Sequence, residues 1–217
     1  MMELETTVVF QKTNQSKKLD RSGHVNNLIV IGHPNVESFC YSGIMHTIKE
    51  TLIAHNEEVR VIDVYRDSFQ RPRTALTSTY KDLIDWSDRI YIVSPVWWFR
   101  LTPRLETFFD EVFTPGYAYN FIPITKKYGY PKPLLGHKKV RTYLTHGAPA
   151  LPILTLYLNS VKLRLVMGVY SFVFGWFKTK TRQFWSVPFV SQDVRLKYLD
   201  RVQRDVAYDI GTTRVPR

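Results

Sequence analysis

Short runs of β-branched residues alternate along this chain with segments whose apolar residues repeat every three or four positions. The run at residues 28–31 is unbroken, as expected for a central parallel strand that is covered on both faces. Segments at residues 59–64, 90–93, 140–144 and 176–185 predict four further strands. Strands that alternate with helical segments are typical of an α/β fold.

Helical patterns fill the intervals between the predicted strands. The predicted helices cover residues 38–52, 80–86, 105–113, 151–175 and 196–206. Ser38 can cap the first of them, and the long helix over 151–175 is expected to be largely buried. Five strands joined to helices by right-handed crossovers predict a doubly wound, three-layer sandwich around a five-stranded parallel sheet.

The same pattern predicts how the chain is divided. We expect one domain over residues 28–210, preceded by a polar, flexible extension at residues 1–27 and followed by a short tail at residues 211–217. Residues 114–139 form a long connection that is punctuated by proline and glycine. A connection of this length is usually a lid, a binding loop or an interface.

The composition fits one soluble domain with a sizeable core, because 44% of the 217 residues are hydrophobic and 23% are charged. Cys40 is the only cysteine, so the chain forms no internal disulfide and no cysteine-built zinc site, and we expect no metal. A single cysteine fits a reducing compartment. The polar N-terminal segment does not resemble a signal peptide, and a cytoplasmic location is therefore expected.

The formal net charge of +11 favours an anionic partner, such as nucleic acid, a phosphorylated cofactor or an acidic membrane surface. The basic residues concentrate near 126–141 and 162–182, and neither cluster forms the regular basic helix face of a DNA-binding protein. We therefore expect no nucleic-acid partner. Lys162 and Arg164 interrupt the longest apolar stretch, residues 151–177, so no transmembrane segment is predicted.

Ligands of a doubly wound sheet bind beyond the carboxyl ends of the strands, where the strand order reverses. The segments after the first, third and fourth strands converge there, at residues 32–41, 94–100 and 145–149. In the first segment, a helix N-terminus and the Ser38 hydroxyl suit a phosphate. The alternatives are that Ser38 only caps its helix and that His33 only bonds within the turn.

The other two segments also have unusual compositions. Residues 97–99 are three consecutive aromatics, which suit a planar ligand but are also common in cores and interfaces. The small residues at 145–149 permit close backbone approach to a ligand. His146 in this turn is either a donor to a ligand carbonyl or a solvated side chain.

These segments, in this order and spacing, resemble the flavodoxin-like NAD(P)H dehydrogenase (quinone) family, which includes quinone reductases and related flavin oxidoreductases. The resemblance covers nearly all of residues 28–206. Its carriers are the stretches GHPNVESF, SPVWWFRLTPRLETFFDEVFTPGYAYNF, LLGHKKV and THGAP. The resemblance implies a flavodoxin-like fold that binds a flavin.

The resemblance also implies a role for each matched segment. The residues at the flavin phosphate would be Ser38, Phe39, the backbone of Cys40 and, beside them, His33. The residues along the isoalloxazine edge would be Pro95, Val96, Trp97, Trp98 and Phe99. The turn on the pyrimidine side, where donors stabilise reduced flavin, would consist of Thr145, His146 and Gly147.

Tyr119 and Phe121 match aromatics that reach over the partner subunit's flavin in family dimers, so the resemblance implies a homodimer with shared sites. The chain departs from the family where well-studied quinone reductases have a tyrosine and a histidine that relay a proton. Ile153 and Asn159 occupy those positions. His146 is the substitute candidate for the catalytic group.

The predicted function is a two-electron reduction of quinones or similar acceptors by NADH or NADPH through a flavin, in a ping-pong sequence. FMN is favoured over FAD, because the sequence shows no adenosine pocket. An alternative of another class is a regulatory flavoprotein subunit that docks on a membrane potassium efflux transporter. The basic surface and the family's ancillary subunits of such transporters suggest this alternative.

Overall fold

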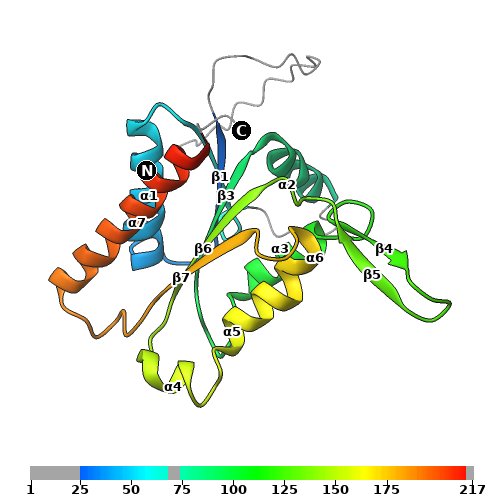
Figure 1. The fold of residues 1–217 in the computed structure, drawn as a ribbon. Helices are drawn as coiled ribbons and strands as arrows, with labels where there is room; N and C mark the ends of the chain where they lie inside the picture. The colour runs from blue at the N-terminus through cyan, green and yellow to red at the C-terminus, as the bar shows by residue number, and fades with distance from the viewer. Residues whose placement is uncertain (1–24, 68–73, 214–217) are drawn as a thin grey trace, which may run out of the picture.

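The computed structural model describes residues 25–67 and 74–213, and five of its strands form one parallel sheet in the order β2-β1-β3-β6-β7 (Figure 1). The strands of this sheet are β1 (Asn26–Ile31), β2 (Glu58–Asp63), β3 (Arg89–Pro95), β6 (Lys139–Thr145) and β7 (Thr179–Phe184). Nearly every residue of β1 and β3 is buried, as expected from the apolar runs at residues 28–31 and 90–93. The predicted doubly wound sheet is confirmed.

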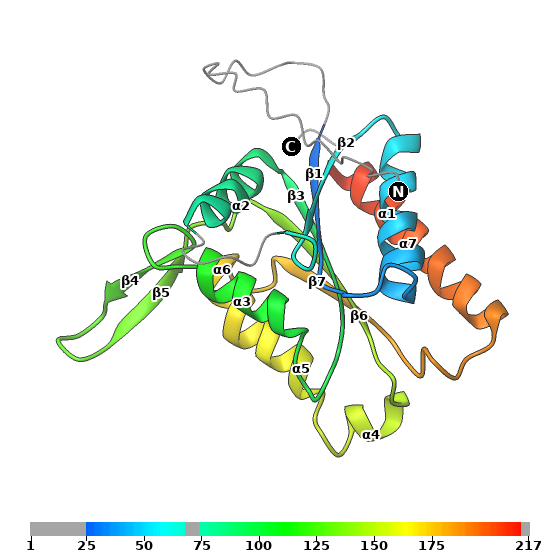
Figure 2. The ribbon, with the colours of Figure 1, turned by 180° about the vertical axis from the view of Figure 1, so that it is seen from behind.

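Helices cover both faces of the sheet (Figures 1 and 2). One face carries η1 (Phe39–Met45), α1 (His46–Ala54) and α7 (Gln192–Thr213). The other carries α2 (Thr74–Trp86), α3 (Pro103–Val112), α5 (Ser160–Leu163), η2 (Arg164–Tyr170) and α6 (Ser171–Val173). Alternate residues of β1 enter the two cores, with Leu28 packed on the α3 side and Ile29 on the α7 side.

The helix predicted over residues 151–175 is divided into shorter pieces. The first is α4 (Ala150–Leu154), and α5, η2 and α6 follow after a break. Leu158 and Asn159 lie in this break with φ values of 49° and 51°, in the left-handed region that a right-handed helix does not include. The expectation of burial is wrong for the first piece, where the leucines are exposed.

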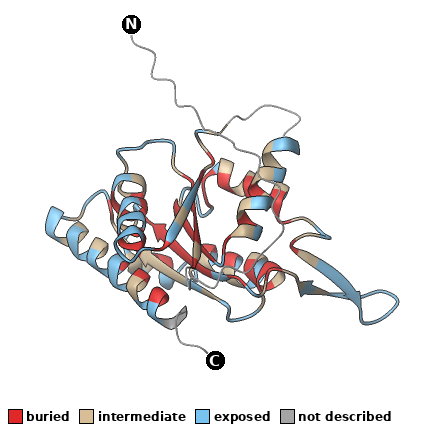
Figure 3. Cartoon of the chain, turned by 90° about the horizontal axis from the view of Figure 1, so that it is seen from above, coloured by how far each residue is buried: buried red, intermediate tan, exposed pale blue. Residues whose placement is uncertain are grey.

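The long connection contains two strands that the sequence pattern did not predict. β4 (Tyr119–Pro123) and β5 (Gly129–Pro133) pair antiparallel and project from the body (Figure 1). Figure 3 shows that most of this hairpin is exposed. Proline is unfavourable within a sheet but is accepted in strands with a free edge, so the prolines here indicated a loop. We call this hairpin the arm.

The ends of the domain differ by a few residues from the prediction. β1 begins at Asn26, whereas the predicted extension at residues 1–27 otherwise lies mostly outside the described residues. α7 continues to Thr213, so the predicted tail begins as helix, and residues 214–217 are also outside the described part. Among the described helices, none combines the length and the hydropathy that a bilayer-spanning segment needs.

Ion pairs fix α7 against the sheet, and the first of them is buried. Arg141 on β6 donates from Nε and Nη2 to the carboxylate of Asp209, at 2.5 and 2.7 Å. Arg182 on β7 donates from Nη2 to Asp205, one turn earlier in α7, at 2.6 Å. Removing one partner of a buried pair leaves an uncompensated charge, which is strongly destabilising. The position of α7 matters because its first turns border the site described next.

Candidate functional site

The turn after β1 leads directly into a helix N-terminus. Ser38 is the N-cap of η1, with φ −63° and ψ 152°, and its Oγ accepts a hydrogen bond from the backbone N–H of Tyr41 at 3.2 Å. No acidic residue lies in the first turn. The partial positive charge of this helix end is therefore not neutralised locally, which favours an anion.

Gly32 brings the end of β1 very close to the start of α3. The hydroxyl of Thr102 donates to the carbonyl of Gly32 at 3.0 Å. A Cβ at Gly32 would lie 2.9 Å from Oγ1 of Thr102 and 3.0 Å from Cβ of Leu105. A side chain would force these groups apart, so this position requires glycine.

His33 follows Gly32, and its contacts define which ring nitrogen carries the proton. The backbone N–H of Asn35 donates to Nδ1 of His33 at 3.0 Å, as the turn-bonding alternative predicted. Partial burial lowers the pKa of His33, so the ring is neutral and carries its proton on Nε2. The edge of Trp97 contacts the ring, with centroids 5.7 Å apart. Nε2 of His33 remains available as a donor.

The aromatic run after β3 is divided by a tight turn. The backbone groups of Trp97 and Arg100 exchange hydrogen bonds of 2.9 and 3.0 Å. Trp98 and Phe99 between them have φ values of 51° and 58°, a left-handed pair that is typical of glycine and asparagine. Trp98 is consequently 90% exposed, and Phe99 packs against Tyr157 with ring centroids 4.5 Å apart and ring planes tilted by 42°.

The end of β6 contacts both the turn after β1 and the segment after β3. The backbone N–H of Val96 donates to the carbonyl of Thr145 at 2.8 Å. Sγ of Cys40 lies 3.1 Å from Oγ1 of Thr145, and burial raises the pKa of the Cys40 thiol to about 12. Cys40 is therefore a packed thiol and not a reactive thiolate. Gly147 leaves the adjoining space open, since a Cβ there would contact nothing within 4 Å.

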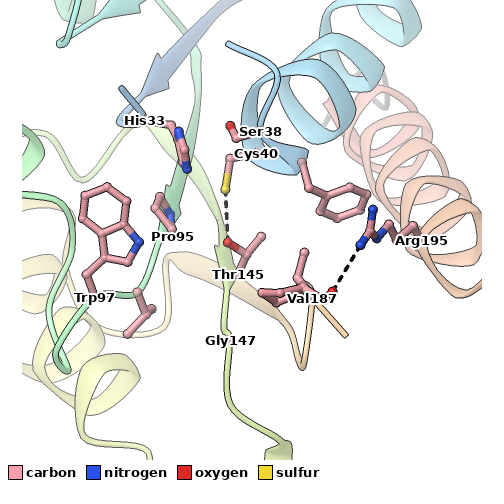
Figure 4. Close-up of a pocket in the computed structure, with 12 residues that line it drawn as sticks. His33, Ser38, Cys40, Pro95, Trp97, Thr145, Gly147, Val187 and Arg195 are labelled. Atoms are coloured by element: carbon pink, nitrogen blue, oxygen red, sulfur yellow. Dashed lines mark hydrogen bonds between the residues drawn. The ribbon is translucent and has the colours of Figure 1, made fainter. Parts of the chain in front are cut away.

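Together these segments enclose a cavity of about 390 Å³ at the carboxyl ends of β1, β3 and β6 (Figure 4). We call this cavity the crevice. Its lining residues are His33, Ser38, Phe39, Cys40, Pro95, Val96, Trp97, Thr145, Gly147, Val187, Pro188 and Arg195. Nine of these twelve were predicted from the sequence. Trp98 and Phe99 were also predicted but do not line the crevice, because the left-handed turn directs them away.

Three lining residues come from a segment that the sequence analysis did not consider. Val187 and Pro188 lie between β7 and α7, and Arg195 lies on α7. The buried Nε of Arg195 has no hydrogen-bond partner among the described residues, and Nη2 reaches only the carbonyl of Pro188, at 3.5 Å. An incompletely paired guanidinium in the wall of a cavity suits an anionic group.

A family model with the flavodoxin-like fold matches residues 26–155, which is more than half of the chain. This chain belongs to the flavodoxin-like fold family. The match runs from β1 through α4 and so includes all three predicted segments of the crevice. The predicted flavodoxin-like fold is therefore confirmed.

A curated relative of this flavodoxin-like chain is the uncharacterized NAD(P)H oxidoreductase YdeQ of Bacillus subtilis (strain 168), with 33% identity over 96 residues. The match covers 44% of this chain and 46% of the relative, less than half of either. Solved structures with the same fold include an NAD(P)H:quinone oxidoreductase from Methanothermobacter marburgensis, with a TM-score of 0.66 at 18% identity over 84% of this chain and 96% of that one.

Another is an FMN-dependent NADH-azoreductase from Bacillus anthracis, solved in complex with FMN, with a TM-score of 0.69 at 13% identity over 85% of this chain and 98% of that one. At these identities the structural likeness shows the fold. The crevice itself is described by the residues of this flavodoxin-like chain that line it.

The predicted catalytic residue, His146, does not line the crevice of this flavodoxin-like protein. Its buried ring stacks on Trp185 at 4.2 Å, and its Nε2 lies 2.9 Å from the amide nitrogen of Gln183. Burial lowers the pKa of His146 to about 4, so the ring is neutral. The prediction that the side chain donates into the crevice has no support from this placement.

The residues at the family's relay positions have other contacts. Ile153 is buried, whereas Asn159 exchanges two hydrogen bonds of 2.9 Å with Gln183. Tyr119 and Phe121 lie on the arm, away from the crevice of their own chain, with ring centroids 5.5 Å apart. In the described part of the chain, no group of histidine, cysteine and acidic side chains could hold a metal.

Proposed function

We propose that this protein is a flavin-dependent NAD(P)H oxidoreductase that reduces quinones or similar acceptors by two electrons. The observation that carries the proposal is the crevice, which gathers nine residues predicted from three separate segments as contacts of one ligand. The names of the B. subtilis and M. marburgensis proteins support the same reaction class. The net reaction is NAD(P)H + H⁺ + quinone → NAD(P)⁺ + hydroquinone.

The residues present fit a flavin phosphate. The capped helix end at Ser38 supplies backbone donors, Nε2–H of His33 supplies another, and the unpartnered Nε of Arg195 supplies positive charge. A cavity of about 390 Å³ is in the usual range for a small-molecule site. We propose FMN as the cofactor, as in the B. anthracis neighbour.

The rest of the crevice would hold the isoalloxazine ring. A bound flavin supplies hydride transfer from NAD(P)H to the acceptor. Pro95, Val96 and Trp97 would orient the ring edge, and the open turn at Gly147 would let backbone donors approach its pyrimidine side. His146 would act beneath this turn as a positioning residue, since its neutral ring is held by Gln183.

We further propose a homodimer in which the arm of one chain covers the crevice of the other. Phe121 is 58% exposed although it is a large aromatic, and the arm residues Ile124 and Tyr128 are also exposed. Apolar groups gathered on a projecting hairpin favour cover by a second copy. Neither the fold nor the relatives favour the alternative of a transporter subunit.

Two variants of Ser38 test the phosphate site. Ser38→Asp keeps a good N-cap but sets a carboxylate against the phosphate, so FMN affinity should fall at least about a hundredfold with little loss of stability. Ser38→Ala removes the cap and the hydroxyl without adding a charge, so it should lose about 1 kcal/mol of stability and lower FMN affinity less than Ser38→Asp does. Titration followed by flavin absorbance and by thermal unfolding measures both quantities.

Failure of the unmodified protein to bind FMN or FAD would refute the proposed function. If FMN binds, steady-state kinetics with NAD(P)H and a small quinone should give parallel double-reciprocal lines, because one shallow site does not easily hold donor and acceptor together. Intersecting lines would contradict the ping-pong sequence while leaving the reductase intact.

A further inference from the structure

A second cavity of about 380 Å³ lies beside α5 and η2, on the α3 face of the sheet. Its walls include Leu158, Leu163, Val166, Met167 and Trp176, and they expose almost only apolar atoms. Lys162 and Asn159 are its polar members. We call it the apolar cavity. A concave site of this composition binds an uncharged apolar group most favourably.

An aromatic contact connects the apolar cavity to the crevice. Trp97 lines the crevice, and Phe99, two residues later, packs against Tyr157 with ring centroids 4.5 Å apart. Leu158, the residue after Tyr157, lines the apolar cavity. This contact places the segment that follows Trp97 against the segment that enters the apolar cavity.

A chain of hydrogen bonds also links the wall of the apolar cavity to the turn beside the crevice. Asn159 in the wall of the apolar cavity is paired with Gln183, and Gln183 contacts Nε2 of His146, all at 2.9 Å. His146 lies between two crevice residues, Thr145 and Gly147. The positions of the two cavities relative to each other are thus fixed by side chains as well as by the backbone.

The walls of the apolar cavity are kept in a costly arrangement. Leu158, Asn159 and Phe177 have φ values of 49°, 51° and 60°, in the left-handed region. Phe177 is 95% exposed. Backbone of this kind persists where the surrounding structure holds it, often at ligand sites. Three such residues line this one cavity.

We propose that the apolar cavity binds the hydrocarbon chain of a lipid-type quinone whose ring enters the crevice. This inference rests on the proposed function and specifies its acceptor as a quinone with an alkyl or prenyl chain. Phe99 and Tyr157 would cover the part of the chain between the two sites. The chain takes no part in electron transfer, so the net reaction is unchanged and only the binding of the acceptor improves.

Two quinones with the same ring test the proposal on the FMN-loaded protein. The expected KM of a benzoquinone with a decyl chain is at least about tenfold below that of its chainless analogue, since each buried CH₂ adds to binding. Leu163→Asp should raise the KM of the decyl quinone at least fivefold and leave that of the chainless one within twofold. Ile53→Asp is the matched control, because Ile53 on α1 is 47% exposed and Leu163 is 46% exposed.

A binding measurement without NAD(P)H gives an independent readout. Quinones quench tryptophan fluorescence on contact, and Trp176 lines the apolar cavity. The decyl quinone should quench a component that is absent from Trp176→Phe, and the chainless quinone should not. Leu163→Asp should weaken this quenching in parallel with its effect on KM.

The outcomes separate the two proposals. If the protein reduces neither quinone, the proposed function fails, and the inference fails with it. If it reduces both with equal KM, or if Leu163→Asp affects both equally, the function stands and the chain site is refuted. Loss of a dimer in Leu163→Asp, seen by sedimentation together with equal effects on both quinones, would show that this face is an interface between copies.

Discussion

The crevice and the arm belong to one chain but are built in opposite ways. In the crevice, segments from four connections bond to one another, as when Thr145 accepts from Val96 and contacts Cys40. The two strands of the arm form their ladder only with each other, and most of their residues are exposed. Figure 3 shows the same contrast between a buried sheet and an exposed hairpin.

This difference shows which part of the molecule is fully packed within one chain and which part is not. The crevice is held by close packing and by polar groups whose partners lie in the same chain, so it should keep its shape in isolation. The arm exposes aromatic surface that its own chain does not cover. Substitutions at packed positions of the crevice should therefore change stability, and substitutions at exposed positions of the arm should change catalysis or assembly.

The largest expected effect comes from the buried ring of His146, which is held neutral next to the crevice residues Thr145 and Gly147. The pKa of His146 is about 4 in the folded protein, against about 6.5 when unfolded, so the unfolded state binds a proton first as pH falls. The free energy of unfolding should decrease below pH 6.5 and lose about 3 kcal/mol by pH 4 from this residue. Denaturant unfolding of the unmodified protein and of His146→Gln over this pH range measures the difference, and parallel curves would contradict it.

The next effect tests how tightly the crevice is packed. Gly32→Ala places a Cβ 2.9 Å from Thr102 and should destabilise the fold by about 1–3 kcal/mol. Gly211→Ala is the control, because a Cβ there meets nothing within 4 Å and α7 should gain roughly 0.5–1 kcal/mol. Equal changes in the midpoint of urea unfolding for the two variants would mean that β1 and α3 are not in close contact.

The arm should respond differently. Tyr119 packs within its own chain, against Phe172 at 6.2 Å, so Tyr119→Ala should cost about 1 kcal/mol of stability. Phe121→Ala should leave stability within about 0.5 kcal/mol, since the side chain is mostly exposed, yet lower kcat/KM about tenfold through the partner's site. Lys126→Ala, at an exposed polar position near the tip, is the control.

Sedimentation and steady-state kinetics check this prediction together. A monomer with full reductase activity would refute the shared site. A dimer whose kcat/KM is unchanged by Phe121→Ala would place the interface on another part of the surface.

The smallest expected effect comes from the tight turn between Trp97 and Arg100, which follows β3. Trp98 is left-handed and 90% exposed, so Trp98→Gly removes backbone strain without removing packing and should stabilise the fold by about 1 kcal/mol. Trp98→Phe keeps the strain and should give no gain. Thermal unfolding of both variants measures this, and a loss of stability in Trp98→Gly would show that the indole has a contact of its own.

Much of the crevice could be predicted from the sequence, because the sequence shows where the buried strands end. The apolar runs locate the ends of β1, β3 and β6, and the parallel topology brings these ends to one edge. β7 ends at the same edge, so the segment after it, which supplies Val187 and Arg195, could have been included by the same rule.

Side-chain direction was harder to predict than position in the chain. Trp97, Trp98 and Phe99 are adjacent in sequence, but Trp98 and Phe99 have left-handed backbone that directs them away from the crevice, and no glycine signals that turn. Neighbouring residues of an extended segment point to opposite sides, so His146 turns toward β7 when Thr145 faces the crevice. The arm was missed because its prolines indicate a loop.

Cys40 gives the crevice an internal reporter. It is the only cysteine of the chain, and its thiol is buried against Thr145 with a pKa of about 12. Alkylating reagents attack a thiolate that they can reach, and this sulfur is neither ionised nor accessible while the wall is intact. The labelling rate of one atom therefore measures how often the wall opens, and a ligand that closes the crevice would slow it in proportion to its occupancy.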